Sequence, residues 1–112
     1  MQFTAKVKNV RFSPYKLRPL ADVVRGKNAT YALNWLKTYP VKRVIPMEKM
    51  LESAVANAKF LNSVEIENLL VKEIRVDQGP IFKYFKAGSR GRPRIQRKRL
   101  SHMSIILETK EV

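Results

Sequence analysis

The sequence predicts an α+β protein: three helices packed on a small three-stranded antiparallel sheet, with a long protruding β-hairpin. Three observations lead to this fold class. Apolar and polar residues alternate near both ends of the chain, apolar residues recur every three or four positions between them, and an acid-free basic run interrupts the C-terminal half. At 112 residues, 45% of them hydrophobic, the chain has material for one core. We therefore expect a single domain over residues 1–112.

The first strand is predicted over residues 3–8. Phe3, Ala5 and Val7 alternate there with a threonine and two lysines. This is the period of a strand that buries one face. The lysines are expected on the outer face.

The first helix is predicted to follow Ser13 as its N-cap, with Pro14 at the first helical position. Pro19 removes a backbone donor within this helix and crowds the preceding turn. The pattern therefore predicts either a kink at Pro19 or a start near Leu17. The apolar residues that recur at helical spacing before Gly26 stops the helix are Leu17, Leu20, Ala21 and Val24.

Two more helices are predicted before the pattern returns to strand. A short one is expected between the cap residue Asn28 and Tyr39-Pro40. A longer one over residues 47–61 has the strongest helical periodicity and is the expected core helix. Its methionines are interpreted as core residues rather than as a cofactor or partner groove. The predicted buried faces hold Ala32, Leu33 and Leu36 in the short helix, and Met47, Met50, Leu51, Ala54, Val55, Ala58 and Leu61 in the long one.

Two strands are predicted to frame the basic run, which Gly79-Pro80 opens. Strands on both sides of a turn-rich insertion predict an antiparallel ribbon over residues 79–100. Each arm of about ten residues would carry the tip about 30 Å from the body. An isolated ribbon is only marginally stable in water. The predicted inner faces are Leu70, Ile74 and Val76 in the second strand, and Met103, Ile105 and Leu107 in the third.

The basic run predicts the partner. No Asp or Glu occurs from Gln78 to Leu107, so its cations repel one another unless a polyanion lies against them. Arginine also binds phosphate through two parallel hydrogen bonds. Tyr84 and Phe85 lie inside the run, and the sequence leaves open whether they stack on bases or pack the ribbon. The candidate nucleic-acid contacts are Lys83, Lys86, Arg90, Arg92, Arg94, Arg97, Lys98 and Arg99.

A second basic cluster lies in the first quarter of the chain, opposed only by Asp22. It predicts another contact surface on the body. Contacts from two regions favour a folded RNA, because a duplex offers one continuous track. The formal net charge of +14 agrees with such a partner. The cluster comprises Lys6, Lys8, Arg11, Lys16, Arg18, Arg25 and Lys27.

The remaining residues argue against catalysis and metal binding. His102 is the only histidine and cysteine is absent, so the ligands of a zinc site are missing. Ser101 and His102 are adjacent on a strand and point to opposite faces, so they form no nucleophile and base pair. His102 is interpreted as a strand residue at the root of the arm. We expect no catalytic residue, no metal and no cofactor.

Three other functions compete with RNA binding. A DNA-bending protein can carry an arginine-rich ribbon arm with proline near the tip, but such proteins commonly dimerise through an apolar face. A small nuclease would need an acid, base or metal cluster that the sequence does not supply. A membrane partner is not expected, because no segment resembles a signal peptide or a membrane span. No predicted helix has a basic face on one side and a wide apolar face on the other either. The DNA-bending alternative would be excluded if the purified chain is a monomer that prefers structured RNA to duplex DNA. A cleavage assay with divalent metal would test the nuclease alternative.

Several short segments together resemble the family of large-subunit ribosomal protein twenty-two. The resemblance covers nearly the whole chain, and its specific part is the series from the third helix to the last strand. The sequence departs from the family at two places. It has Pro19 where the family usually continues its helix, and Ala87-Gly88 where a proline and an arginine are expected. The segments are Ser13-Pro14 with Lys16 and Arg18, Val24-Arg25-Gly26-Lys27, Ala32-Leu33 with Leu36, Ser53-Ala54-Val55-Ala56-Asn57-Ala58, Val76-Asp77-Gln78-Gly79-Pro80, Gly91-Arg92, and Lys98-Arg99-Leu100-Ser101-His102.

The resemblance implies a structural, non-enzymatic RNA-binding protein that supports large-subunit assembly and translation in a cytoplasmic or organellar ribosome. Its implied partners are large-subunit rRNA and neighbouring ribosomal proteins, and no homo-oligomer is expected. The body would lie near the mouth of the peptide exit tunnel. The hairpin would reach the tunnel wall, where its tip could meet the nascent peptide. The implied tip residues are Gly88, Ser89, Arg90, Gly91, Arg92, Pro93 and Arg94.

Overall fold

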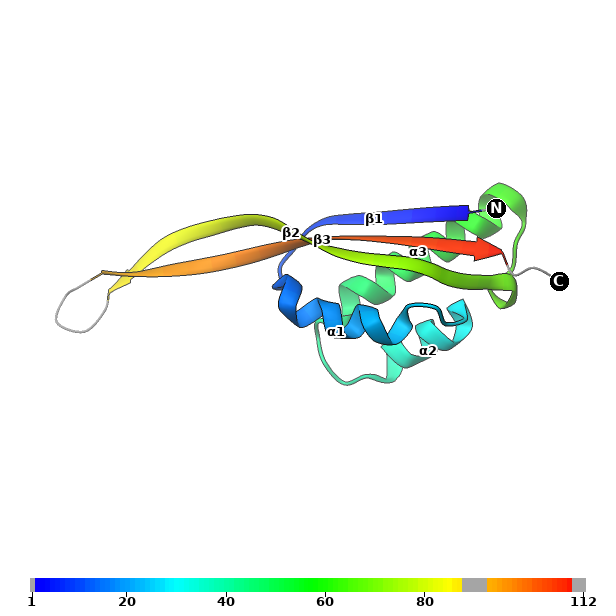
Figure 1. Cartoon of the computed structure of the whole chain (residues 1–112), viewed down its shortest axis with the longest axis horizontal. Helices are drawn as coiled ribbons and strands as arrows, with labels where there is room; N and C mark the ends of the chain where they lie inside the picture. Colours follow the sequence, from blue (N-terminus) through cyan, green and yellow to red (C-terminus); the bar gives the residue numbers. More distant parts are fainter. Residues whose placement is uncertain (1, 88–92, 110–112) are drawn as a thin grey trace.

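Three helices lie on one face of a three-stranded antiparallel sheet, which confirms the predicted fold class (Figure 1). The computed structural model describes residues 2–87 and 93–109, with side chains for residues 2–81 and 98–109. The strand order is β1-β3-β2, so the last strand is central. In chain order the elements are β1 (Gln2–Val10), α1 (Pro14–Val24), α2 (Ala29–Thr38), α3 (Val44–Asn62), the short 3-10 helix η1 (Ile66–Asn68), β2 (Leu69–Ala87) and β3 (Pro93–Thr109).

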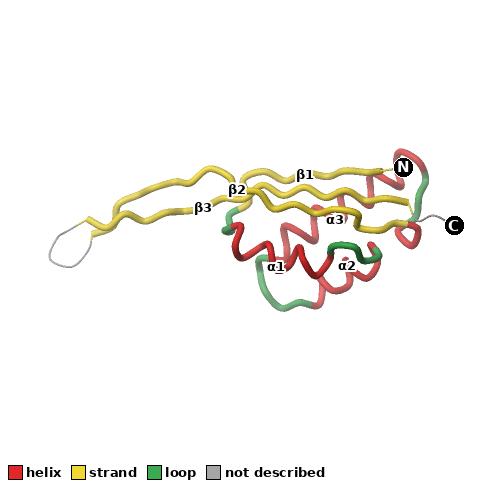
Figure 2. The backbone as a smooth tube through the Cα atoms, in the orientation of Figure 1, coloured by secondary structure: helices red, strands yellow, loops and turns green. Residues whose placement is uncertain are grey.

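Strands β2 and β3 continue well beyond the body as a two-stranded ribbon (Figure 2). Their register runs without interruption from Ile81 opposite Arg99 to Ala87 opposite Pro93. The radius of gyration is 17.2 Å, against about 13 Å for a compact domain of this length. A protruding two-stranded ribbon is therefore present over the described residues 79–87 and 93–100, and we call the predicted segment 79–100 the arm.

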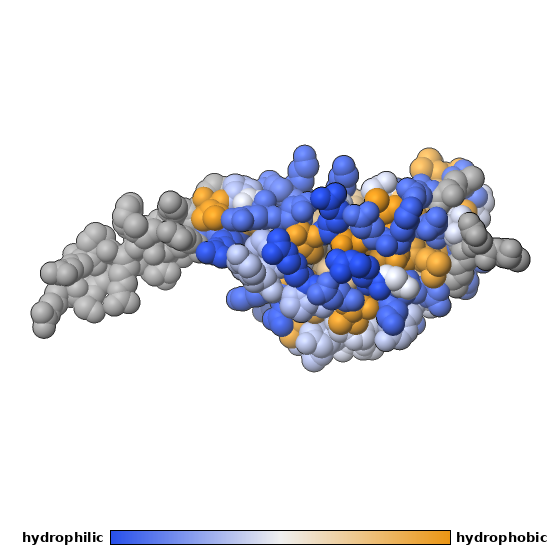
Figure 3. Space-filling model, in the orientation of Figure 1, coloured by the Kyte–Doolittle hydropathy of each residue, from blue (hydrophilic) through white to orange (hydrophobic). Residues whose placement is uncertain are grey.

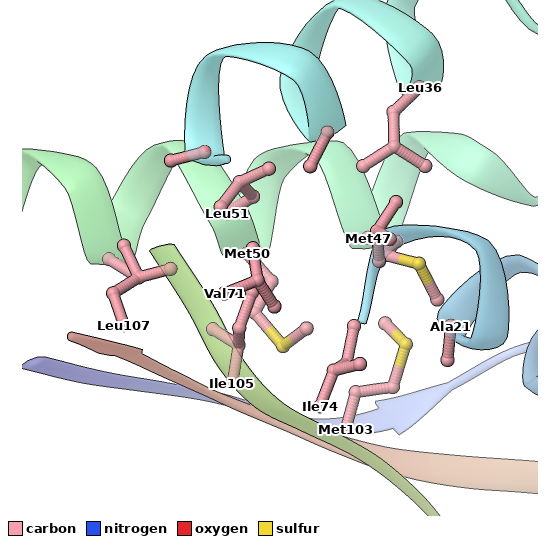
Figure 4. Packing of buried hydrophobic residues seen from close by; sticks show 14 of the residues in the cluster. Ala21, Leu36, Met47, Met50, Leu51, Val71, Ile74, Met103, Ile105 and Leu107 are labelled. Carbon is pink, nitrogen blue, oxygen red and sulfur yellow. The ribbon is translucent and has the colours of Figure 1, made fainter. Parts of the chain in front are cut away.

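The core lies between the sheet and α3, with α2 packed on the outer side of α3 (Figure 4). Met47, Met50 and Leu51 of α3 are fully buried, and Met50 points toward the sheet where Ile105 lies. The predicted core helix is thus confirmed, and its methionines serve as packing. The buried hydrophobic residues form one cluster that includes members of all three helices and all three strands. No helix in the described part of the chain is long and apolar enough to cross a membrane.

A bulge in β2 overturns one predicted strand face. Val71 pairs with Leu107 and Glu73 pairs with Ile106, so Lys72 is an extra residue in β2. A bulge shifts the alternation of side chains by one position. The buried residues are consequently Leu69 and Val71 before the bulge and Ile74 and Val76 after it, and Leu70 was wrongly assigned to the inner face.

The first helix begins at Pro14 and continues unbroken through Pro19, so the alternative start near Leu17 is wrong. Tyr15 and Pro19 are both exposed, so water can solvate the Tyr15 carbonyl that Pro19 leaves without a donor. Ser13 and Asn28 occupy the predicted N-cap positions, but neither side chain makes a capping hydrogen bond. Backbone geometry alone starts these two helices.

The third helix is longer than predicted, and its end differs. It runs from Val44 to Asn62, and the residue that follows it, Ser63, is left-handed. The backbone amide of Val64 bonds back to the Ala58 carbonyl, and Val64 packs against the core. Leu61, predicted to be buried, is 66% exposed. The chain therefore turns back toward the core after the helix, and Val64 supplies the contact expected from Leu61.

Candidate nucleic-acid interface

Arginines of α1 and its C-terminal end lie along the outer edge of β2, which is an edge strand of the sheet. Arg18 donates from Nε to the Val76 carbonyl oxygen at 3.3 Å, and Arg25 donates from a terminal nitrogen to the Ile74 carbonyl oxygen at 2.9 Å. The following loop bonds to the same edge, through reciprocal backbone hydrogen bonds that link Val71 with Gly26 and Lys27 at 2.9 Å. These contacts occupy backbone groups that an open edge would offer to another strand.

Arg18 and Arg25 both belong to the second basic cluster of the sequence. Their bonds to the edge of β2 give them a structural role that the sequence did not reveal. Arg25 also bonds Asp22 at 2.6 Å, and both of these side chains are well exposed to solvent. A guanidinium has five N–H donors in a fixed fork. One or two donors hold the strand edge, and the others remain available on the surface.

Tyr15 links α1 to the root of the arm. The Arg18 guanidinium lies 5.7 Å from the centre of the Tyr15 ring, and the Arg99 guanidinium lies 5.6 Å from it. Arg99 belongs to β3 and pairs with Ile81 at the start of the arm. The two basic clusters, far apart in sequence, therefore meet at one exposed aromatic ring. No pattern in the sequence singled out Tyr15, because its role depends on where β3 returns.

The other described cations of the prediction do not all share one face. Arg11 follows β1, and Lys16 lies on α1. Lys27 lies in the α1–α2 connection, and its Nζ is 5.8 Å from the centre of the Tyr31 ring. All three are exposed. Lys6 and Lys8, assigned to the same cluster, lie instead on the sheet face that the helices leave uncovered. Strongly hydrophilic residues gather over α1 and the neighbouring part of the sheet (Figure 3).

The register of the arm places cations directly opposite one another. Lys83 pairs with Arg97, and Lys86 pairs with Arg94. Like charges at opposed positions of an antiparallel pair destabilise it. Lys98 at the root is exposed, while Arg90 and Arg92 lie outside the described residues, as do the predicted tip positions 88–92. Pro93 and Arg94, also assigned to the tip, begin β3.

Few carboxylates balance this charge in the described part of the chain. Its three ion pairs join Arg25 to Asp22, Lys37 to Glu52, and Arg75 to Glu73. Only the first involves a predicted contact residue. Within the described ranges, no group of three His, Asp or Glu side chains is placed to hold a metal ion. The described cations at the α1–arm junction are thus arranged to attract anions.

Comparison with known proteins adds an independent observation. The family described as "Ribosomal protein L22p/L17e" matches residues 5–108. A large ribosomal subunit protein uL22 from Desulfatibacillum aliphaticivorans is 41% identical over 108 residues, which are 96% of this chain and 99% of that protein. The protein of the same name from Herpetosiphon aurantiacus is 42% identical over 112 residues, 100% of this chain and 99% of that protein. The one from Bdellovibrio bacteriovorus is 39% identical over 110 residues, 98% of this chain and all of that protein.

Proposed function

This chain belongs to the ribosomal protein L22p/L17e family, and we propose that it binds large-subunit rRNA through the arm and the basic face of α1. It is a protein of the large ribosomal subunit and not an enzyme. Its proposed role is structural: the cations neutralise repulsion between RNA segments that assembly brings together.

The single observation that carries the proposal is the register of the arm. The register pairs two basic residues at each of two levels of the ribbon, and a free two-stranded ribbon is only marginally stable in water. A polyanion laid along the ribbon would neutralise these cations and so remove their repulsion. Each contact with a phosphate would also release a counterion, which favours binding. The arm is therefore proposed to gain its stability from the RNA.

The contact between Tyr15 and Arg99 supports a continuous binding surface from arm to body. The proposed body contacts Arg18 and Arg25 are held by the edge of β2, so little side-chain freedom is lost when phosphate binds. The proposed contacts are Arg11, Lys16, Arg18, Arg25 and Lys27 on the body, and Lys83, Lys86, Arg90, Arg92, Arg94, Arg97, Lys98 and Arg99 in the arm.

The position of the tip is the finer part of the proposal. The family resemblance implies that the hairpin runs to the wall of the peptide exit tunnel, where residues 88–94 could meet the nascent peptide. The longest dimension of the molecule, 66 Å against 24 and 18 Å across, suits a body outside a channel and an arm within it. Neighbouring ribosomal proteins are the other proposed partners.

A monomer is proposed as the binding form. The β2 edge within the body is occupied by Arg18, Arg25 and the loop that follows them. At the opposite edge, the Asn57 side-chain amide donates to the Thr4 carbonyl oxygen of β1 at 3.2 Å. Pairing of two sheets edge to edge would have to break these bonds. This weighs against the dimeric DNA-bending alternative.

The test compares removal of the arm with removal of its charge. One variant lacks residues 82–98, and a second replaces Lys83, Lys86 and Arg97 with glutamine. We expect both to fold, because the core lies in the body, and to enter large subunits less well than the unchanged chain. The matched control replaces Lys42, Lys49 and Lys59, which lie outside the proposed surface. Crosslinking of the native particle should join residues 83–99 to large-subunit RNA.

The outcomes separate cleanly. Equal incorporation of all variants would contradict anchoring by the arm. Reduced incorporation of the deletion but not of the charge variant would show that shape, rather than these cations, carries the binding. Crosslinks confined to the first quarter of the chain would move the site to the body.

A further inference from the structure

The sheet face that the helices leave uncovered carries a polar hollow near the root of the arm. It has a volume of about 240 Å³, several times the share of about 30 Å³ that a water molecule takes in the liquid. The outward-pointing residues that line it come from all three strands and are Lys6 and Lys8 of β1, Arg75 and Asp77 of β2, and His102 and Ser104 of β3.

The strand register arranges these residues in rows. Ser104 of the central strand pairs with Lys6 on one side and with Arg75 on the other. In the next row, His102 pairs with Asp77. Residues paired across antiparallel strands have neighbouring side chains on the same face. The Ser104 hydroxyl therefore lies between two cations, and the His102 imidazole lies beside the Asp77 carboxylate.

His102 is held in one tautomer. The backbone N–H of Asn9 donates to His102 Nδ1 at 3.1 Å, so a neutral ring carries its proton on Nε2. Asn9 has a φ of 60° and lies where β1 gains an extra residue between the pairs Val7–Met103 and Val10–Ser101. This bulge aims an amide at the ring. Nε2 has no hydrogen-bond partner among the residues that the structure describes, which leaves a donor in the wall of the hollow.

The chemistry of the lining favours an anion with several acceptor oxygens. Three cations face one carboxylate, Asp77, and Arg75 shares its charge with Glu73 at 3.7 Å. The two lysines, exposed and without a carboxylate among the described residues, add flexible point charges. Ser104 adds an O–H donor and His102 an N–H donor. A phosphodiester oxygen accepts from all of these groups and carries the charge that the cations attract, whereas a base edge is uncharged and a metal ion is repelled by the cations.

We propose that this hollow is a second RNA-backbone site, in which Lys6 and Lys8 neutralise a phosphodiester and His102 Nε2–H donates to it. The inference rests on the proposed function, since the RNA is the same. It adds a contact surface on the other side of the sheet from the helices. The RNA would then hold the root of the arm from the α1 side and from the uncovered sheet face.

The lysines give the primary test. Purified chain is bound to a transcript of large-subunit rRNA over a range of KCl concentrations. Replacing Lys6 and Lys8 with glutamine should lower the slope of log K against log salt by roughly two, about one for each phosphate that the variant no longer neutralises. It should also raise the Kd about tenfold at moderate salt. Lys49 and Lys59 on α3, replaced in the same way, are the matched control and should change neither quantity.

Two replacements of His102 separate binding from folding. His102→Asn keeps an acceptor near the Nδ1 position and removes the distal donor, so the fold should persist while RNA affinity falls several-fold. His102→Gln keeps a distal N–H donor and removes the acceptor for Asn9. It should unfold at a lower temperature but bind RNA more tightly than the asparagine variant.

The result that overturns the site is an unchanged Kd and salt slope for the double lysine variant. If the arm variants still weaken binding, the proposed function stands and only this site is wrong. If no variant weakens binding, the proposed function fails first. Normal RNA binding with impaired entry into large subunits would show that this face takes an acidic protein segment, which also overturns the proposal.

Discussion

The body and the arm share two strands, β2 and β3, yet different forces stabilise them. In the body the strands bury alternate residues under α3 and α1, and a third strand flanks them. Past Gly79 and Leu100 they continue as a ribbon that no helix covers in the described part of the chain (Figure 2). The register there opposes cation to cation. Along its length, one strand pair thus changes from a structure stabilised by the core to one that we propose depends on its RNA partner.

The change occurs at a single level of the sheet. Strand β1 ends at Val10, opposite Ser101, and β2 gains an extra residue between the pairs Gln78–Ser101 and Ile81–Arg99. The Ser101 hydroxyl, fully buried, donates to the Phe12 carbonyl oxygen at 2.6 Å. The junction is therefore ordered by specific contacts. The arm should keep a fixed direction at its root even where its own stability is low.

The largest effect on the body should come from its core. Leu51 is fully buried in α3, so Leu51→Ala should lower the free energy of unfolding by about 3 kcal/mol, because it removes buried apolar surface and leaves a cavity. Urea denaturation followed by circular dichroism measures this. The matched control, Leu61→Ala, removes a side chain that is 66% exposed and should change stability by less than about 0.5 kcal/mol. Equal effects of the two substitutions would mean that α3 ends differently from the structure.

The second prediction concerns the junction. A Cβ on Gly79 would lie 3.0 Å from the Leu100 carbonyl oxygen and 3.3 Å from His102 Cε1. Because a backbone atom cannot swing aside, Gly79→Ala should shift the strands and cost about 1–2 kcal/mol. NMR amide shifts should change most near Leu100. The control Pro80→Ala leaves this close approach intact, and an equal perturbation there would contradict the steric explanation.

Sequence periodicity predicted the elements whose alternation is regular. The inner face of β3 and the core stripe of α3 as far as Ala58 follow one period, and Met103, Ile105 and Leu107 are buried as predicted. Periodicity misassigned Leu70 of β2, because Lys72 adds one residue and reverses the phase. Nothing local marks this bulge. It is defined by the partner strand, whose position the sequence does not encode in any short window.

The candidate site was predictable in composition but not in arrangement. Charge alone selected Arg18 and Arg25, yet their bonds to the edge of β2 depend on how α1 packs. Lys6 and Lys8 were grouped with them, but strand alternation and helix packing put the two pairs on different surfaces. His102 was correctly interpreted as a strand residue at the root of the arm. Its bond to Asn9 requires a bulge that the sequence pattern did not show.

The third prediction separates the two roles of Arg25. Arg25→Lys keeps the charge but removes the planar fork that reaches both Asp22 and the Ile74 carbonyl. We expect the free energy of unfolding to fall by about 1 kcal/mol, the usual net value of such hydrogen bonds. The salt dependence of RNA binding should be unchanged, since one cation replaces another. A flatter salt slope with normal stability would instead assign Arg25 to the RNA alone.

The smallest effect should come from Tyr15, the contact through which body and arm meet. Its ring lies near two guanidinium groups, and exposed cation–π contacts contribute about 0.5–1 kcal/mol each. Tyr15→Leu should therefore weaken the link between α1 and β3 by about 1 kcal/mol, whereas Tyr15→Phe, which keeps the ring, should be nearly neutral. A double-mutant cycle with Arg99→Gln measures the coupling directly. If the coupling is zero in the free chain but appears in the RNA complex, the arm and the body are joined by the RNA. If the coupling is present in both the free chain and the complex, the junction is already formed before RNA binds. The RNA is then needed only for the outer part of the arm, where the register pairs basic residues.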